Sequence, residues 1–220
     1  VVDPATVITT HIKETIKRHA HEIMGRQETQ ALLDKFKETN PKVVEELIPN
    51  ALSLGKVQRV LQNLLREQIS IRDLRTILEK LSDYSSLTQD PDVLTEYVRQ
   101  GLARPITKQY QSNDGTLSVI TLDRSIEDAI EGSIQRSETG AFLALEPNVA
   151  ERFLTRLKAM IEKITPNIET SPVLLASPGL RMHIRKFTER FLPDLVIISH
   201  SEVASSVQIK NLGVVDLNAN

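Results

Sequence analysis

The sequence VLQNLLREQISIRDLRTILE, residues Val60–Glu79, carries two apolar stripes separated by a short polar break. Positions 54, 57, 60, 61 and 64 form the first stripe, and positions 71, 74, 77, 78 and 81 form the second, all of them Leu, Ile or Val. Each spacing is typical of a helix that buries one face. The stretch therefore predicts two amphipathic helices joined by a turn of about three residues.

The start of the second helix is predicted from the sequence Ser70-Ile71-Arg72-Asp73. The Ser70 hydroxyl can accept a hydrogen bond from an early amide while Asp73 reaches back, which is the arrangement of a capping box. Arg72 and Arg75 are then expected on the solvent-exposed face, where they are candidate interface residues. Paired helices of this kind indicate a binding module and not a catalytic site.

Residues 1–111 are predicted to be helical throughout. Asp3-Pro4 and Asp90-Pro91 each combine a preferred N-cap residue with proline at the first helical position. Pro105 is expected to kink the last of these helices, or to break it and begin another turn. Beyond the central pair, the predicted helices cover residues 4–25, 26–40 and 91–103.

The pattern changes at Ser112-Asn113-Asp114-Gly115, a turn cluster that marks the candidate domain boundary. Strand-like runs then alternate with helical stripes, which favours crossover connections and a mostly parallel sheet. The predicted fold class is α+β overall, with an N-terminal all-helical subdomain followed by a smaller α/β subdomain. Strands are expected at 117–122, 142–145, 173–176, 195–199 and 207–217, and helices at 125–136, 149–164 and 180–191.

The composition narrows the class of protein. Charged residues make up 25% of the 220 residues and the net charge is -2, so no sequence-wide field attracts nucleic acid or anionic lipid. The chain has no cysteine, which excludes disulfides and thiolate metal sites. No apolar run approaches the roughly 20 residues that a membrane-spanning helix needs.

The residue types that often bind metals or carry catalysis are not arranged for either role. His19 and His21 are two positions apart on a predicted helix and point about 200° apart, so they cannot share an ion. No cofactor and no metal are expected. Ser177 follows a predicted strand and precedes a helix, so its amides can bind an anion, or the segment is a plain strand-to-helix connection. An enzyme would require a deep polar pocket near Ser177, at the carboxyl ends of the strands.

The alternative function is that of a helix-turn-helix DNA-binding regulator. The central pair has the outline of this motif, with Arg72 and Arg75 on the second helix. Asp73 and Glu79 interrupt that face with negative charge, and positive residues on one amphipathic helix are usually its solvated side. Further positive residues nearby are Lys56, Arg59 and Arg66.

Further stretches of the sequence match a known family. In the first half they are Val1–Pro4 with Thr6, Val7, Thr10 and His11, then Arg18–Glu22 with Gly25–Glu28, then Leu64–Glu67 with Ser70–Glu79, and Thr95–Arg99. The second half agrees more loosely, at Leu145-Glu146-Pro147, Ser177-Pro178 and Gly213-Val214-Val215. On these residues the sequence resembles the cytoplasmic half of the type III secretion export-gate family, in its flagellar branch.

This resemblance implies a non-enzymatic docking platform of the flagellar protein export apparatus. Such a platform forms a homo-oligomeric ring and binds export chaperones with their cargo, components of the export ATPase complex and other export-gate proteins. The parent protein is expected in the bacterial inner membrane, with this part on the cytoplasmic face. Membrane contact and the remaining cytoplasmic parts are expected upstream of Val1, so that this sequence is a fragment. Nucleic acid is not an expected partner.

The resemblance further implies subdomain limits and a binding site. Residues 1–11 match the tail of a preceding subdomain, 12–111 the helical ring-forming subdomain, and 112–220 the α/β terminal subdomain. Val7 and Thr10 match positions of the family's chaperone-binding hydrophobic dimple, and Val2 is a further candidate. Because the other wall of the dimple is expected upstream of Val1, this fragment alone is expected to bind chaperones weakly or not at all.

Overall fold

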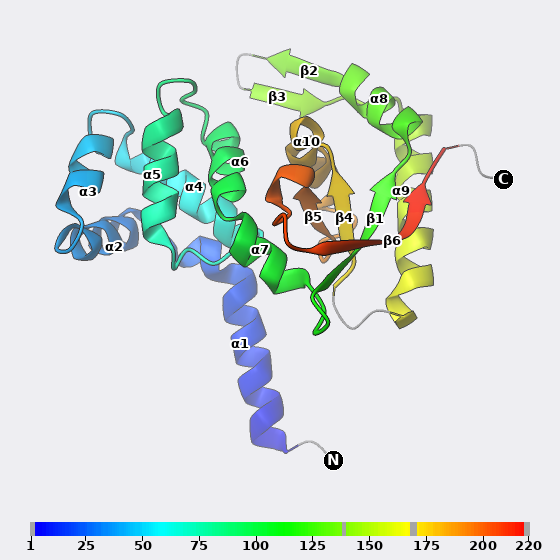
Figure 1. Ribbon diagram of the computed structural model, residues 1–220, viewed down its shortest axis with the longest axis horizontal. Helices are drawn as coiled ribbons and strands as arrows, with labels where there is room; N and C mark the ends of the chain where they lie inside the picture. Colours follow the sequence, from blue (N-terminus) through cyan, green and yellow to red (C-terminus); the bar gives the residue numbers. More distant parts are fainter. Residues whose placement is uncertain (1–2, 138–139, 168–170, 218–220) are drawn as a thin grey trace. The chain divides into compact units, whose positions relative to one another are not determined.

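The computed structural model describes residues 3–137, 140–167 and 171–217 of the chain (Figure 1). The chain forms two compact units, residues 1–102 and 103–220. The helix Ala103–Tyr110 belongs to the second unit, whereas the sequence places the boundary after it, at the turn cluster Ser112–Gly115.

Unit 1 is helical in its described residues, and its core lies where the sequence places it. The buried residues of the central pair are positions 57, 60, 61 and 64 of one helix and 74, 77, 78 and 81 of the next, so both predicted stripes are confirmed. Positions 54 and 71, at the start of each stripe, are only half-buried. The helices are α1 (Pro4–Ile23), α2 (Arg26–Lys37), α3 (Pro41–Leu47), α4 (Leu54–Arg66), α5 (Leu74–Tyr84) and α6 (Pro91–Gly101).

The predicted capping box at Ser70 is wrong, and the connection between α4 and α5 is longer than predicted. Asp73 is the N-cap of α5, and its side chain accepts a hydrogen bond from the Thr76 amide at 3.2 Å. The chain leaves α4 through Gln68 at φ 57°, and the Ile69 amide donates to the Leu64 carbonyl at 2.9 Å. This helix ending buries Ile69 and uses residues 67–73 as the connection. Of two suitable caps, the later one therefore starts the helix.

Replacing Asp73 with alanine tests this revised helix start. We expect Asp73→Ala to lower the free energy of unfolding by about 1 kcal/mol, because the Thr76 amide loses its acceptor. Ser70→Ala is the matched control, with an expected change below about 0.5 kcal/mol, since the Ser70 hydroxyl accepts only from Arg72 within the connection. Urea denaturation followed by circular dichroism measures both values. The reverse order of effects would restore Ser70 as the cap.

Proline residues set three other boundaries of unit 1. Asp3 and Asp90 are N-caps with Pro4 and Pro91 behind them, as predicted. Pro41 not only ends the preceding segment but also opens α3, a short helix whose limits the sequence analysis did not give. Since proline fits the first turn of a helix as well as it ends one, its position alone does not distinguish these roles.

The described part of unit 2 alternates strands and helices. Its elements are α7 (Ala103–Tyr110), β1 (Thr116–Leu122), α8 (Arg124–Gly132), β2 (Ile134–Ser137), β3 (Gly140–Leu143), α9 (Pro147–Ile164), η1 (Thr165–Asn167), β4 (Val173–Ala176), α10 (Pro178–Thr188), β5 (Val196–Ser199), η2 (His200–Glu202) and β6 (Gln208–Val215). Four of the strands form a parallel sheet in the order β5–β4–β1–β6, so the predicted mostly parallel sheet is confirmed.

Pro105 lies inside α7, a helix of its own that begins after α6 has ended. Of the two outcomes expected at this proline, the helix is therefore broken and a new one begins.

The helix predicted over 125–136 is too long. It ends at Gly132, and the next residues form β2, which pairs with β3 as an antiparallel hairpin. The strand predicted at 142–145 is this β3, displaced by two residues toward the N-terminus. A four-residue strand such as Ile134–Ser137 is too short to show a clear hydrophobic period, so the sequence alone does not predict it. It forms a strand because it pairs with β3.

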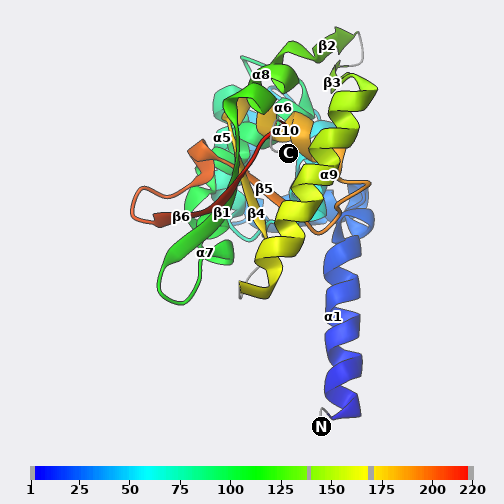
Figure 2. The ribbon, with the colours of Figure 1, turned by 90° about the vertical axis from the view of Figure 1, so that its right-hand side faces the viewer.

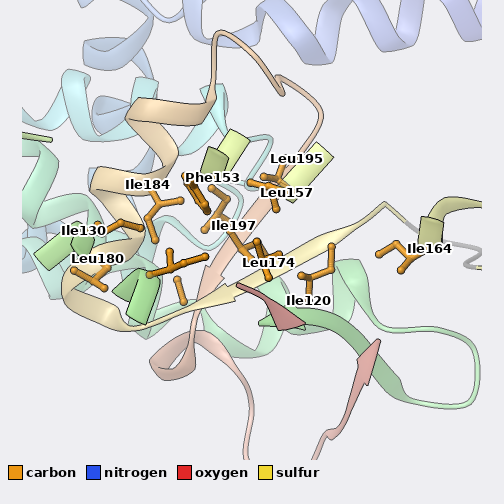
Figure 3. Packing of buried hydrophobic residues seen from close by; sticks show 13 residues of the cluster. Ile120, Ile130, Phe153, Leu157, Ile164, Leu174, Leu180, Ile184, Leu195 and Ile197 are labelled. Carbon is orange, nitrogen blue, oxygen red and sulfur yellow. The ribbon is translucent and has the colours of Figure 1, made fainter. Parts of the chain in front are cut away.

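The core of unit 2 lies between the sheet and helices α8, α9 and α10 (Figure 3). Phe153 and Leu157 of α9 and Ile184 of α10 pack with Leu174 of β4 and Ile197 of β5. All four residues of β4 are buried, so this central strand is covered on both faces. The arrangement places the ends of β1 and β4 at one edge of the sheet, beside the starts of α8 and α10.

Candidate docking surface on helix α1

Helix α1 is the most exposed helix of unit 1. Residues 3–19 are all exposed, and the half-buried positions Ala20 and His21 occur only in its last turns. That end is held by α4, where the side-chain amides of Gln58 and Gln62 both donate to the Met24 backbone carbonyl, at 3.2 and 2.9 Å. The rest of α1 extends away from the other helices of unit 1 in both views (Figures 1 and 2).

The exposed part of α1 borders an open space of about 430 Å³, called here the hollow, which in the described residues is lined by this helix alone. Two of the residues that the resemblance selects, Val7 and Thr10, both line it, whereas Val2 falls outside the described residues. Thr6, His11 and Glu14 complete the described lining, and the sequence analysis did not select them. Val7, Thr10, His11 and Glu14 follow Thr6 by one, four, five and eight residues, which places all five on a single helix face. This spacing can be read from the sequence.

The hollow combines an apolar centre with polar and charged edges. Val7 is half exposed, and the hydroxyl groups of two threonines, the His11 imidazole and the Glu14 carboxylate surround it. The Lys17 ammonium approaches Glu14 at 3.1 Å on the exposed side of the helix. An apolar anchor with charges around it is the composition of a protein-binding surface and not of a reaction centre.

The histidines near the end of α1 make local contacts. The His19 Nδ1 atom is 2.8 Å from Glu22 Oε1, and this hydrogen bond holds the pKa of the Glu22 carboxyl below its usual value. The His21 Nε2 atom is 3.8 Å from the same oxygen. No group of three metal-ligating side chains occurs in the part of the chain that the structure describes.

Arg72 and Arg75 are not on a common recognition helix. Arg72 lies in the connection before α5, and the guanidinium of Arg75, on the first turn of α5, donates to the Asn40 side chain. The longer connection and the displaced Arg72 depart from the predicted helix-turn-helix outline, in which both arginines belong to the second helix. Neither arginine lines the hollow on α1.

A second hollow, of about 500 Å³, opens at the carboxyl ends of β1 and β4 beside Ser177. The Ser177 amide and hydroxyl both donate to Glu127 Oε1, at 3.3 and 2.7 Å. The anion position that the sequence suggested at Ser177 therefore holds the chain's own carboxylate. The described lining contains no imidazole or amine that could serve as a base for the Ser177 hydroxyl. It consists of Leu122, Arg124, Glu127, Asp128, Glu131, Ile134, Ser177, Gly179 and Leu180.

Comparison with known proteins matches residues 1–208 to the FHIPEP family. The chain belongs to this family. The flagellar biosynthesis protein FlhA of Bacillus subtilis (strain 168) is 46% identical to this FHIPEP chain over 217 residues, which are 99% of the chain and 32% of that protein. The chain thus spans about a third of the length of the curated relatives that it matches. The predicted resemblance to the type III secretion export-gate family is confirmed.

Solved structures agree with this FHIPEP assignment. The Chlamydia pneumoniae CdsV protein, solved as a complex with CdsO, superposes with a TM-score of 0.90 at 33% identity, covering 98% of this chain and 63% of that one. The nonameric cytosolic domain of EscV, from the type III secretion system, gives a TM-score of 0.81 at 34% identity, covering 96% and 62%. In the described residues of the FHIPEP chain, no helix has the length and apolarity to cross a bilayer.

Proposed function

We propose that this chain is part of a cytoplasmic docking platform in a flagellar type III export gate, and that it acts by binding proteins without catalysing a reaction. The observation that carries the proposal is the hollow on α1, where Val7 and Thr10 lie together. In this reading the parent protein lies in the bacterial inner membrane. Its partners are export chaperones with their cargo, export ATPase-complex components and other export-gate proteins.

Ring formation is the second part of the proposal. It is supported by the nonameric assembly of the EscV domain, and partner binding is supported by the CdsV–CdsO complex. We assign ring contacts to the helical subdomain, residues 12–111, and we take residues 112–220 as the α/β terminal subdomain. The exposed Arg72 and its neighbour Arg75 are the proposed interface residues. Residues 1–11 then contribute one wall of the chaperone site, and the wall opposite comes from sequence upstream of Val1.

A binding measurement on two lengths of the protein tests the chaperone site. We expect a flagellar chaperone to bind the protein extended upstream of Val1 and to bind this 220-residue chain at least about tenfold more weakly, because one wall is absent. In the extended protein, Val7→Asp is expected to weaken binding by at least about tenfold, since it places a charge at the apolar centre of the hollow.

The matched control is Thr15→Asp, which adds the same charge at an exposed position of α1 outside the hollow. Its expected effect on chaperone affinity is less than about threefold, within the range of rim substitutions. Isothermal titration calorimetry gives all four affinities. Equal binding by the two lengths, or equal effects of the two aspartates, would count against the site.

A further inference from the structure

The parallel sheet of unit 2 has two edge strands that differ in exposure. On β5, at one edge, Ile197, Ile198 and Ser199 are each at most 2% exposed. On β6, at the other edge, residues 208–211 are all exposed, and the Ile209 side chain is 48% exposed. The sheet is therefore closed along β5 and accessible along β6.

The backbone of β6 is paired with a strand on one side only. It runs parallel to β1, and no other strand of the described residues lies beside it. The N–H and C=O groups on its far side thus have no strand partner. Such an edge is a template on which another extended segment can add as a strand.

Only the first half of β6 offers a regular template. The register with β1 is regular over Gln208–Asn211 and shifts at the next residue, Leu212, which is an extra residue on β6. A bulge of this kind interrupts the ladder and limits pairing along an edge. The segment Gln208–Asn211, called here the open edge, is therefore the part of β6 that can accept a strand.

The open edge presents an apolar side chain on one face of the sheet and a positive charge on the other. Ile209 and Lys210 are neighbours along the strand, so their side chains point to opposite faces. Lys210 is exposed and makes no ion pair with the residues that the structure describes. An added strand would place one side chain beside Ile209 and the next beside Lys210. Apolar pairs and pairs of opposite charge are the cross-strand neighbours that stabilise a sheet.

We propose that the open edge of β6 binds an extended segment of a partner protein, in which apolar and acidic residues alternate, as an additional strand. The apolar side chains of that segment pack beside Ile209, and its carboxylates lie beside the Lys210 ammonium. Main-chain hydrogen bonds supply the affinity in this mode of recognition, and the alternate side chains supply the specificity. The proposal goes beyond the chaperone site, because no residue of the hollow on α1 takes part.

A second copy of the chain is a less suitable occupant than such a segment. Because β5 is buried, a second copy would have to pair through its own β6, and this two-fold arrangement brings the two Lys210 side chains close together. Two-fold pairs also cannot build a ring with an odd number of copies, such as the nonameric EscV domain. This second reason rests on the ring formation proposed above.

Two short fluorescein-labelled peptides test the charge preference, one of alternating valine and glutamate and one of alternating valine and lysine. We expect the 220-residue chain to bind the valine–glutamate peptide with saturation below about 1 mM, and the valine–lysine peptide at least about fivefold more weakly. Lys210→Glu is expected to reverse this order, which a loss of folding could not do. Lys158→Glu, at an exposed position of α9, is the matched control and is expected to keep the order. Fluorescence anisotropy measures the affinities.

A second pair of variants tests where the peptide binds. Ile209→Asp is expected to weaken binding of the valine–glutamate peptide at least about fivefold, because the apolar pair is lost and a like charge replaces it. Val214 is 45% exposed on the same face of β6 but lies beyond the bulge, so the matched control Val214→Asp is expected to change the affinity by less than about twofold. Amide hydrogen exchange is expected to slow in residues 208–211 when the peptide binds.

Four results would overturn the proposal. They are an absence of saturable peptide binding below about 1 mM, an unchanged preference in Lys210→Glu, equal effects of the two aspartates, and binding that leaves exchange in the open edge unchanged. Self-association of the chain that Ile209→Asp abolishes would identify a second copy as the occupant and would also overturn it. None of these results bears on the chaperone site, which is tested separately through Val7.

Discussion

Phe153→Ala is expected to lower the free energy of unfolding by about 3–5 kcal/mol. Phe153 is 1% exposed, and it fills the space between α9, α10 and the sheet together with Leu157, Ile184 and Ile197 (Figure 3). Alanine removes the whole ring and leaves a cavity that the rigid parallel strands cannot close. The loss therefore includes both the transfer free energy of the ring and the missing packing contacts.

The chain offers a matched control for this substitution. Phe187 is flanked by two phenylalanines, with ring centroids 6.2 Å away for Phe153 and 6.3 Å for Phe191. Phe191 is 61% exposed, so Phe191→Ala removes a similar ring contact without creating a cavity, and we expect a loss below about 1 kcal/mol. Urea denaturation followed by circular dichroism gives both values. Equal losses would mean that the ring pairs, and not burial, stabilise this region.

The parts of the fold that sequence predicts well have strong periodic patterns. The stripes of α4 and α5 and the apolar run of β4 are buried as expected, because a residue on the apolar side of a long element has few other places to go. The ends of elements are less determined. Ser70 and Asp73 are both good N-caps, and the choice between them depends on burying Ile69, a tertiary contact that local pattern does not contain.

The candidate site likewise has a part that the sequence predicts and a part that depends on tertiary contacts. The resemblance selects Val7 and Thr10, and the hollow that contains both extends to Thr6, His11 and Glu14 by helix geometry alone. What occupies the start of α10 could not be predicted. Glu127 and Ser177 are fifty residues apart in sequence, and their hydrogen bond exists only because β1 and β4 are neighbouring parallel strands. Long-range polar contacts of this kind depend on sheet order, which the sequence pattern leaves open.

The buried ion pair of unit 2 is another long-range contact that local sequence pattern does not reveal. Arg181 of α10 and Glu202 of η2 are 1% exposed each, and Arg181 Nε is 3.7 Å from Glu202 Oε1. The same carboxylate oxygen accepts from the Ser199 hydroxyl at 2.8 Å, and the Glu202 carbonyl accepts from the Thr107 hydroxyl of α7 at 3.0 Å. Glu202 thus connects α7, the end of β5 and α10.

We expect Glu202→Ala to lower the free energy of unfolding by about 3–5 kcal/mol, because the Arg181 guanidinium remains buried after losing its carboxylate. Glu162→Ala is the matched control: its carboxylate meets Lys158 at 3.9 Å on the exposed face of α9, and we expect a loss below about 1 kcal/mol. The double variant Arg181→Met with Glu202→Leu removes both charges and is expected to recover part of the stability lost in Glu202→Ala. Urea denaturation measures the series. A double variant less stable than Glu202→Ala would mean that the unpaired Arg181 charge does not cause the loss. The hydrogen bonds from Ser199 to Glu202 and from Arg181 to the Ile197 carbonyl would then be the interactions that stabilise this part of unit 2.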